Sequence, residues 1–267
     1  MTTYFKRLRE VVLERGPLCV GIDPHPSLLQ AWGLPLSAQG AEKCARHVVN
    51  VLGEKVAAFK PQSAFFERYG SAGIAALERV IADIGPTGAM CILDAKRGDI
   101  GSTMEAYADA YLTDGSPLAA DAITLSPYLG FGSLLPAIER AQKFERGVYI
   151  LARTSNPEGA SVQLALNEEG SVVQNIIDAA TEFNRQSRQK AVGLVVGGTH
   201  TTLGCDLSDF NGSILVPGIG FQGGRMEDLP KLFGDAVEQV LAVVGRGVLS
   251  VGPDSQALRA KVAKLLG

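Results

Sequence analysis

Several residue types are scarce in this 267-residue chain, and their scarcity excludes whole classes of protein. There are four cysteines, far apart and without a C-x-x-C spacing, and three histidines without the spacing of metal ligands. This pattern argues against a disulfide framework and against a zinc site. A catalytic cysteine is the less favoured alternative, because few histidines could serve as its base. We expect buried, reduced thiols at Cys19, Cys44, Cys91 and Cys205.

Neither sign of charge is in excess, and no long apolar run occurs. The 25 basic and 28 acidic residues leave a formal net charge of −3, with no basic run that would suit nucleic acid or an anionic membrane. The longest weakly charged stretch, residues 122–138, is interrupted by prolines and glycines, and the first ten residues carry four charges. We therefore expect no membrane span, no secretory signal and a cytoplasmic location, with neither nucleic acid nor membrane as a partner.

Short apolar runs recur along the whole chain, which is 46% apolar. Each run is continuous rather than alternating, as is typical of parallel strands buried on both faces. We count eight runs, at residues 19–23, 57–61, 91–96, 122–127, 148–154, 191–198, 213–220 and 240–247.

Segments with helical periodicity lie between these runs, most clearly at residues 103–112, 168–186 and 255–266. Eight strand-helix units give about 33 residues each, and about 250 residues are typical of a (β/α)8 barrel. The sequence therefore predicts an α/β fold, a (β/α)8 TIM barrel. No linker-like stretch divides the chain, so we expect a single domain over residues 1–267. A doubly wound open sheet is the alternative, but its glycine-rich turn would follow the first strand, whereas here such turns come late.

Ionisable residues end three consecutive apolar runs. Asp23 ends the first run, Lys60 the second, and Asp94 and Lys96 the third, while Asp99 follows in the next turn. Catalytic groups of such barrels lie at the carboxyl ends of strands, and residues two apart in an extended strand share a face. We therefore expect one shared site. A purely structural cluster of ion pairs is the alternative, because buried charges must pair.

Glycine-rich turns follow the last two predicted strands. PGIGFQGG (217–224) and VGRG (244–247) occur where barrels often hold a phosphate, and Arg246 would add a bidentate guanidinium. Turn glycines with a surface arginine are the alternative. The two clusters together indicate an enzyme that uses Lys and Asp for proton chemistry on a small phosphorylated molecule. We expect no metal, because the lysines already supply positive charge.

The segment DAKRGDIGST, residues 94–103, resembles the signature D-x-K-x-x-D-I-x-x-T of the orotidine 5'-phosphate decarboxylase family. The resemblance covers nearly the whole chain. The residue identities in this segment are similar to those of the longer, type 2 branch of the family. The stretch 156–173 also resembles an insertion typical of that branch. The other matching residues follow in chain order, namely Asp23 in VGIDP, Lys60 in FKPQ, Ser155 in ARTSNP, Gln222 in PGIGFQGG and Arg246 in VGRG.

This resemblance implies decarboxylation of orotidine 5'-monophosphate (OMP) to uridine 5'-monophosphate (UMP) and carbon dioxide, the last step of de novo UMP biosynthesis, without a cofactor. It implies that Lys96 donates the proton to carbon six of the ring and that Asp94 lies beside the departing carboxylate. Lys60 would hold both residues in place and contact the ribose.

The same resemblance assigns the binding residues. Asp23 would bind a ribose hydroxyl, Ser155 would bind the edge of the pyrimidine, and Gln222 would span base and phosphate. Arg246, with Gly245 beside it, would clamp the phosphate.

Two further features are implied for the whole assembly. Asp99 and Thr103 would reach into the site of a neighbouring subunit, which implies a homodimer with two shared active sites. The loop over residues 221–227 would close over bound substrate.

Two other functions compete with this interpretation. Related barrels act on keto-sugar phosphates with Mg²⁺, but they usually carry a metal-binding glutamate where this chain has Lys60. A phosphosugar-binding module without catalysis would be expected to lose part of the charged set, whereas Lys60, Asp94, Lys96 and Asp99 are all present.

Overall fold

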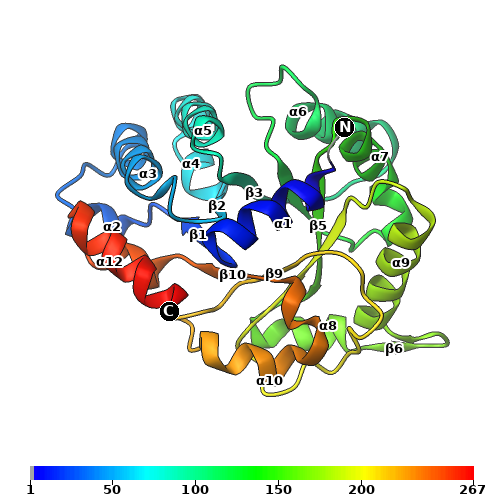
Figure 1. The fold of residues 1–267 in the computed structure, drawn as a ribbon. Coiled ribbons are helices and arrows are strands. Elements are labelled where there is room, and N and C mark those ends of the chain that lie inside the picture. The colour runs from blue at the N-terminus through cyan, green and yellow to red at the C-terminus, as the bar shows by residue number, and fades with distance from the viewer. Residues whose placement is uncertain (1–2) are drawn as a thin grey trace.

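Eight parallel strands form a closed ring in the structure, a computed structural model that describes residues 3–267 (Figure 1). Their order around the ring follows the chain, and the last strand pairs with the first. The predicted (β/α)8 TIM barrel is therefore confirmed, and each predicted run overlaps one strand. The strands are β1 (Leu18–Ile22), β2 (Ala58–Pro61), β3 (Met90–Arg97), β4 (Ala122–Leu125), β5 (Gly147–Arg153), β8 (Val192–Val196), β9 (Ile214–Val216) and β10 (Val240–Val244).

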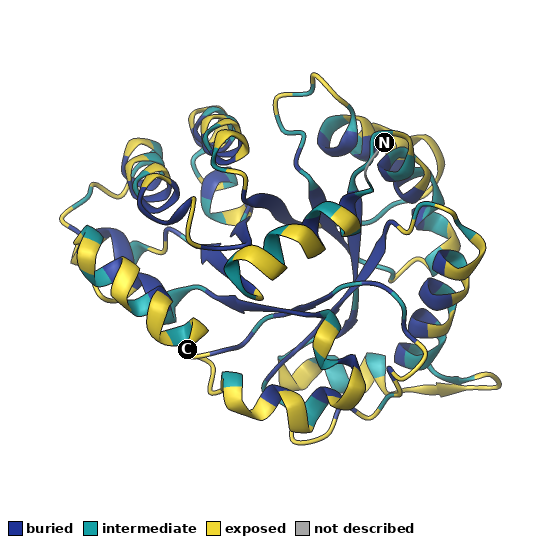
Figure 2. Ribbon diagram, in the orientation of Figure 1, coloured by how far each residue is buried: buried dark blue, intermediate teal, exposed yellow. Residues whose placement is uncertain are grey.

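Helices surround the ring and turn their buried faces toward it (Figure 2). The α-helices are α1 (Tyr4–Arg15), α2 (Pro26–Ala31), α3 (Ala38–Leu52), α4 (Ala64–Glu67), α5 (Gly70–Ile84), α6 (Gly101–Leu112), α7 (Leu135–Lys143), α8 (Ala160–Gln163), α9 (Val172–Gln186), α10 (Leu229–Phe233), α11 (Arg246–Leu249) and α12 (Ser255–Leu266). Short 3-10 turns are η1 (Gly85–Thr87), η2 (Phe131–Leu134), η3 (Pro157–Gly159), η4 (Met226–Asp228) and η5 (Gly234–Gln239). Ser37, Ser171 and Asp254 cap α3, α9 and α12 by accepting a hydrogen bond from the backbone N–H three residues on.

The predicted helices are confirmed, although two of them begin at a different residue, α6 at Gly101 and α9 at Val172. The helix expected over residues 255–266 is α12, and the one expected over 103–112 is α6. The helix expected from residue 168 begins only at Val172, because residues 168–169 form the turn of a short hairpin. That hairpin pairs β6 (Leu166–Asn167) with β7 (Gly170–Ser171) inside the stretch expected to be an insertion, and the sequence did not predict it.

The core has two layers, one inside the ring and one between the ring and the helices. Side chains alternate between these layers along each strand, so Cys19 packs inside the ring while Val20 packs toward the helices. The inward-facing rows of the first three strands end on charged residues, namely Asp23, Lys60 and Asp94. Alternation along the strand thus brings these three side chains to one end of the ring.

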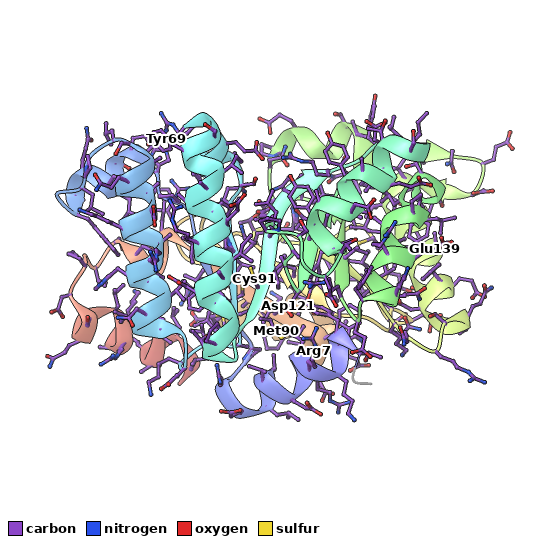
Figure 3. All side chains as sticks on the ribbon, turned by 90° about the horizontal axis from the view of Figure 1, so that it is seen from above. Arg7, Tyr69, Met90, Cys91, Asp121 and Glu139 are labelled. Atoms are coloured by element: carbon purple, nitrogen blue, oxygen red, sulfur yellow. The ribbon has the colours of Figure 1, made fainter. Side chains whose placement is uncertain are left out.

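Helix α1 closes the opposite, amino-terminal end of the ring and lies across its centre in Figure 1. Its Tyr4 and Leu8 belong to the inner core layer. In Figure 3, Arg7 lies beside Asp121 at the base of the strands, and Arg7 Nη1 is 3.1 Å from Asp121 Oδ1. With this end filled, the carboxyl end of the ring is left for a ligand.

Three of the four cysteines are buried as expected, whereas Cys205 is more exposed than expected. Cys19, Cys44 and Cys91 are buried and Cys205 is half-buried, and none of them forms a disulfide. No helix within residues 3–267 is long and apolar enough to cross a membrane.

Candidate active site

A cavity of about 280 Å³ opens at the carboxyl ends of the strands. It gathers eight of the residues predicted from the sequence, namely Asp23, Lys60, Asp94, Lys96, Ser155, Gln222, Gly245 and Arg246. Asp99 and Thr103 are not among the described residues that line it. The elements that converge here run from β1 to the start of α11, so nearly the whole chain contributes to one site.

Asp94 is the centre of the charged cluster. One carboxylate oxygen, Oδ2, lies 2.6 Å from Lys60 Nζ, and the other, Oδ1, lies 2.6 Å from Lys96 Nζ. Gln62 Nε2 and Thr124 Oγ1 each donate a further hydrogen bond to Asp94 at 2.9 Å. Both carboxylate oxygens are thus doubly satisfied, and Asp94 accepts from four side chains.

The cluster fixes the charge of its buried members. Burial by itself would raise the pKa of the Asp94 carboxyl group, but the ammonium groups of Lys60 and Lys96 outweigh burial and hold that pKa well below its usual range. Burial would lower the pKa of Lys60, whereas the carboxylates of Asp94 and Asp23 outweigh it and hold the pKa above its usual value. At neutral pH Asp94 therefore has no proton to donate, and Lys60 keeps its own.

Lys96 differs from its two partners in its exposure. Its side chain is 46% exposed, whereas those of Lys60 and Asp94 are 7% and 8% exposed. Of the three, Lys96 is the group that can both touch a ligand and recover a proton from solvent.

The backbone reaches this arrangement in an unexpected way. Asp94 and Lys96 meet, as predicted, but not through a regular extended strand, because the pairing of β3 with β4 shifts register between Leu93 and Arg97. Lys96 has φ +46°, in the left-handed region, which costs about 1–3 kcal/mol for a residue other than glycine. Its N–H donates to Thr124 Oγ1 at 2.9 Å, so the neighbouring strand helps to hold the strained turn.

A carboxylate with one unpartnered oxygen among the described residues follows β1. Asp23 Oδ1 is buried and has no hydrogen-bond partner among residues 3–267. Gly245 leaves room for this carboxylate, since a Cβ at position 245 would stand 3.2 Å from Asp23 Oδ2. Asp23 is therefore able to accept a hydrogen bond from a ligand hydroxyl in the cavity.

The rest of the cavity rim combines a polar pair with a guanidinium. Ser155 Oγ donates to Gln222 Oε1 at 3.1 Å, which joins the ends of two different loops. The Arg246 guanidinium lies 3.6 Å from the centroid of the Phe221 ring, in a cation–π contact. Gly218 has φ +99° and Gly220 has φ +84°, conformations that favour glycine and that let the chain turn here.

The wall between these polar groups is apolar. A flat ring could pack there while polar groups at either side hold its substituents. The side chains that form the wall are Leu151, Val195, Leu215, Ile219 and Val243.

Two residues of the cluster, Gln62 and Thr124, are not among those predicted from the sequence. Gln62 follows Lys60 by two positions and so continues the same inward row. Thr124 is the polar side chain of the otherwise apolar strand β4. Either signal could have been used, because both residues stand on strands already predicted to end at the site.

Asp99 and Thr103 lie beyond the cavity of their own chain. Asp99 Oδ1 accepts a hydrogen bond from the Ile100 N–H at 2.8 Å, and Thr103 is exposed on α6. The structure therefore does not bring them together with the other predicted site residues.

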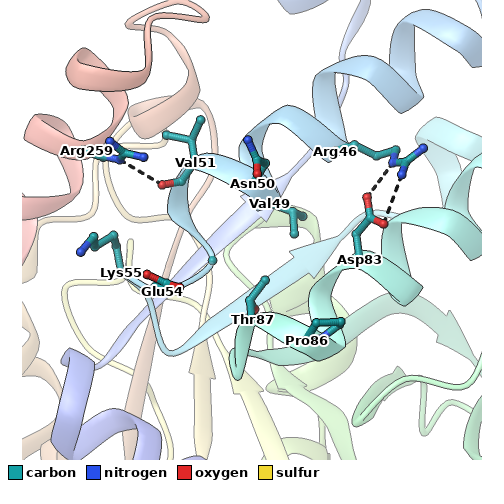
Figure 4. A pocket seen from close by; sticks show the side chains of 11 residues that line it. Arg46, Val49, Asn50, Val51, Glu54, Lys55, Asp83, Pro86, Thr87 and Arg259 are labelled. Carbon is teal, nitrogen blue, oxygen red and sulfur yellow. Dashed lines mark hydrogen bonds and ion pairs between the residues drawn. The ribbon is translucent and has the colours of Figure 1, made fainter.

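A second cavity, of about 460 Å³, lies between α3, α5 and α12 at the other end of the barrel (Figure 4). Its arginines are already engaged. Arg46 Nε is 2.6 Å from Asp83 Oδ2, and Arg259 Nε donates to the Val51 carbonyl at 3.3 Å. Within residues 3–267, no group of three or more His, Cys, Asp or Glu side chains is placed to hold a metal ion. The carboxyl-end cavity is therefore the candidate active site.

Comparison with known proteins identifies the family of this chain. Residues 16–260 match the family described as orotidine 5'-phosphate decarboxylase / HUMPS. An orotidine 5'-phosphate decarboxylase from Salinispora tropica is 50% identical over 268 residues, covering 100% of this chain and 96% of that protein. One from Streptomyces coelicolor is 49% identical, covering 97% of this chain and 94% of that protein.

Solved structures share the fold. A crystal structure from Streptomyces avermitilis, assigned as an orotidine 5'-phosphate decarboxylase, superposes with a TM-score of 0.93 at 48% identity, covering 100% of this chain and 94% of that one. A Leishmania donovani UMP synthase gives a TM-score of 0.80 at 31% identity and covers 99% of this chain, which spans 56% of that longer protein.

Proposed function

Because this chain belongs to the orotidine 5'-phosphate decarboxylase / HUMPS family, we propose that it converts OMP to UMP and carbon dioxide, the last step of de novo UMP biosynthesis. The observation that carries the proposal is the chain of charges from Lys60 through Asp94 to Lys96 at the mouth of the barrel. We expect the enzyme to act in the cytoplasm, without a metal or cofactor.

The reaction needs two things from the protein. Breaking the bond between ring carbon six and the carboxylate leaves the electron pair on that carbon, and a proton must then be added there. The Lys96 ammonium supplies both, since its positive charge stabilises the developing carbanion and its proton completes the product. Lys96 then regains a proton from solvent, to which its side chain is open.

Asp94 and Lys60 prepare this step without exchanging protons. Asp94 binds the Lys96 ammonium and lies beside the substrate carboxylate, a contact that is relieved when carbon dioxide leaves. Lys60 neutralises Asp94 from the buried side and faces the ribose. Because the cluster is held by hydrogen bonds before substrate arrives, little reorganisation accompanies the reaction.

The remaining lining residues bind the nucleotide. Asp23 accepts a hydrogen bond from a ribose hydroxyl. The edge of the pyrimidine is bound by Ser155 and Gln222. Arg246, with Gly245 beside it, holds the phosphate. Closure of residues 221–227 over the phosphate makes its binding energy available at the reacting carbon.

We further propose that the protein acts as a homodimer in which Asp99 and Thr103 complete the partner's site. Their position outside the cavity of their own chain supports this arrangement.

An absorbance assay with OMP tests the proposal. We expect rapid loss of OMP absorbance both in plain buffer and with excess EDTA. No loss, or loss only without EDTA, would contradict it and favour the Mg²⁺-dependent keto-sugar phosphate chemistry.

In the same assay Lys96→Ala should lower turnover by at least about 10⁴-fold while UMP binding stays measurable, because the proton donor acts only after binding. The matched control is Lys55→Ala, an exposed lysine of the second cavity, which should behave as wild type.

A further inference from the structure

Both polar atoms of one peptide group, the Ala95–Lys96 peptide, are held by side chains. Its N–H donates to Thr124 Oγ1 at 2.9 Å, from inside the ring. Its carbonyl oxygen, on Ala95, accepts from Arg97 Nη1 at 3.0 Å, from the side of the helices. This is the peptide that leads into the left-handed turn at Lys96.

Arg97 is itself fixed by two helices. Its Nη2 donates to Glu67 Oε1 at the end of α4 and to the Tyr111 hydroxyl on α6, the latter at 3.1 Å. The guanidinium also lies over the rings of Tyr107 and Tyr111, 5.6 and 5.7 Å from their centroids. Glu67 in turn accepts from the Ser63 hydroxyl. The Arg97 side chain therefore connects α4 and α6 to the backbone next to Lys96.

We propose that Arg97 is a positioning residue for the reaction, which fixes the Ala95–Lys96 peptide and thereby aims the Lys96 ammonium at the substrate. This inference rests on the proposed role of Lys96. Arg97 does not line the cavity, so it acts on the reaction through Lys96 rather than by touching the nucleotide. Thr124 also helps to position Lys96. Its hydroxyl accepts a hydrogen bond from the Lys96 N–H and donates one to Asp94 Oδ1, and the same Asp94 oxygen binds Lys96 Nζ.

A lysine could not replace this arginine. The planar guanidinium binds the Ala95 carbonyl through one nitrogen while the other binds Glu67 and Tyr111. An ammonium group has one nitrogen and cannot span these partners in the same plane. Arg97→Lys therefore keeps the charge but releases the peptide.

The test compares Arg97→Lys with a matched control, Arg140→Lys. Arg140 is equally sheltered, with 28% of its side chain exposed against 25% for Arg97, and it also pairs with α6 through Asp109, at 2.7 Å. For Arg97→Lys we expect kcat to fall by about 10- to 100-fold, since small misplacement of a catalytic group has effects of this size. The Kd of UMP should change by less than about threefold. Exchange of the Lys96 amide hydrogen, followed by NMR, should become faster.

The control should leave kcat, UMP binding and Lys96 amide exchange unchanged. Partial recovery of kcat when methylguanidinium is added to Arg97→Ala would further support positioning. The inference is overturned if Arg97→Lys retains wild-type kcat and Lys96 exchange, or if kcat falls only in step with UMP binding and thermal stability. If the wild-type protein does not decarboxylate OMP, the proposed function fails by itself, while the amide exchange still shows whether Arg97 fixes Lys96.

Discussion

At the scale of single residues, the two lysines around Asp94 have different tasks because of their exposure. Lys60 is buried, so its charge is tolerable only beside a carboxylate, and its first contribution is to keep Asp94 ionised and in place. Lys96 reaches the cavity, and in the proposed reaction it carries the exchangeable proton. Asp94 therefore links stability to catalysis, and removing its charge should affect both.

Asp94→Asn should change how stability depends on pH. In the wild type the pKa of Lys60 is raised, so its stabilising contribution is fully present below the ordinary lysine pKa, about 10.4, and is lost as pH rises above it. In the variant Lys60 stays buried without its closest carboxylate, so burial lowers its pKa and stability rises as pH climbs toward about 10.4. We expect a loss of about 3–5 kcal/mol at pH 7 that narrows by pH 9.5, measured by urea unfolding. A loss of equal size at both values would contradict this.

The sequence predicted the charged residues better than their neutral neighbours. A charge at the end of an apolar run is conspicuous, and strand alternation is a local property, so Asp23, Lys60 and Asp94 could be placed together. Gln62 and Thr124 are ordinary polar residues, and only their distance to Asp94 gives them a role. The left-handed turn at Lys96 depends on contacts from other strands and helices, which no local pattern contains.

At the scale of elements, α1 closes the barrel with few residues. Tyr4 is 1% exposed, and its hydroxyl donates to the Tyr149 hydroxyl at 3.2 Å inside the ring. It also fits tightly, since a Cβ at Gly147 would stand 2.4 Å from its ring. The sequence could not predict this closure, because only Tyr4 and Leu8 of α1 are buried and two apolar residues make no clear pattern.

Truncation of Tyr4 should lower the free energy of unfolding without affecting the site at the carboxyl end of the ring. We expect Tyr4→Ala to cost about 3–5 kcal/mol through the cavity it leaves, and Tyr4→Phe to cost about 1 kcal/mol through the lost hydrogen bond. Leu13→Ala is the control on the same helix, because Leu13 is 78% exposed and its truncation should stay within about 0.5 kcal/mol. Urea unfolding measures the losses, and kcat under folded conditions should stay near wild type in all three. A kcat loss in Tyr4→Phe would show that the two ends of the barrel are coupled.

At the scale of the whole molecule, one exposed apolar face adjoins the segment that carries Asp99. Ile100, Tyr128 and Leu129 are 62%, 80% and 52% exposed. The Ser126 N–H donates to the Arg97 carbonyl at 2.7 Å, which holds the loop after β4 beside the loop after β3. Grouped apolar side chains of this kind often mark a protein interface. This face is where the proposed dimer would bring Asp99 to its partner's cavity.

Mixing two inactive variants tests the shared sites. A dimer of Lys96→Ala with Asp99→Ala holds one site with both residues intact, so random mixing should restore about a quarter of wild-type activity. Sedimentation velocity should show dimers for each variant alone, which is the control for assembly. Activity of the mixture no higher than the sum of its parts would mean that each chain carries its own complete site.

The pairing of β10 with β1 sets when this site can form during synthesis. Leu18 lies opposite Ala242, so the ring stays open, with two unpaired strand edges, until more than two hundred residues have been joined. Asp23 emerges from the ribosome early, whereas Gly245 and Arg246, which lie beside it at the end of the neighbouring strand, emerge among the last residues. The nascent chain thus exposes aggregation-prone edges for most of its translation, and nucleotide binding can stabilise only the finished barrel.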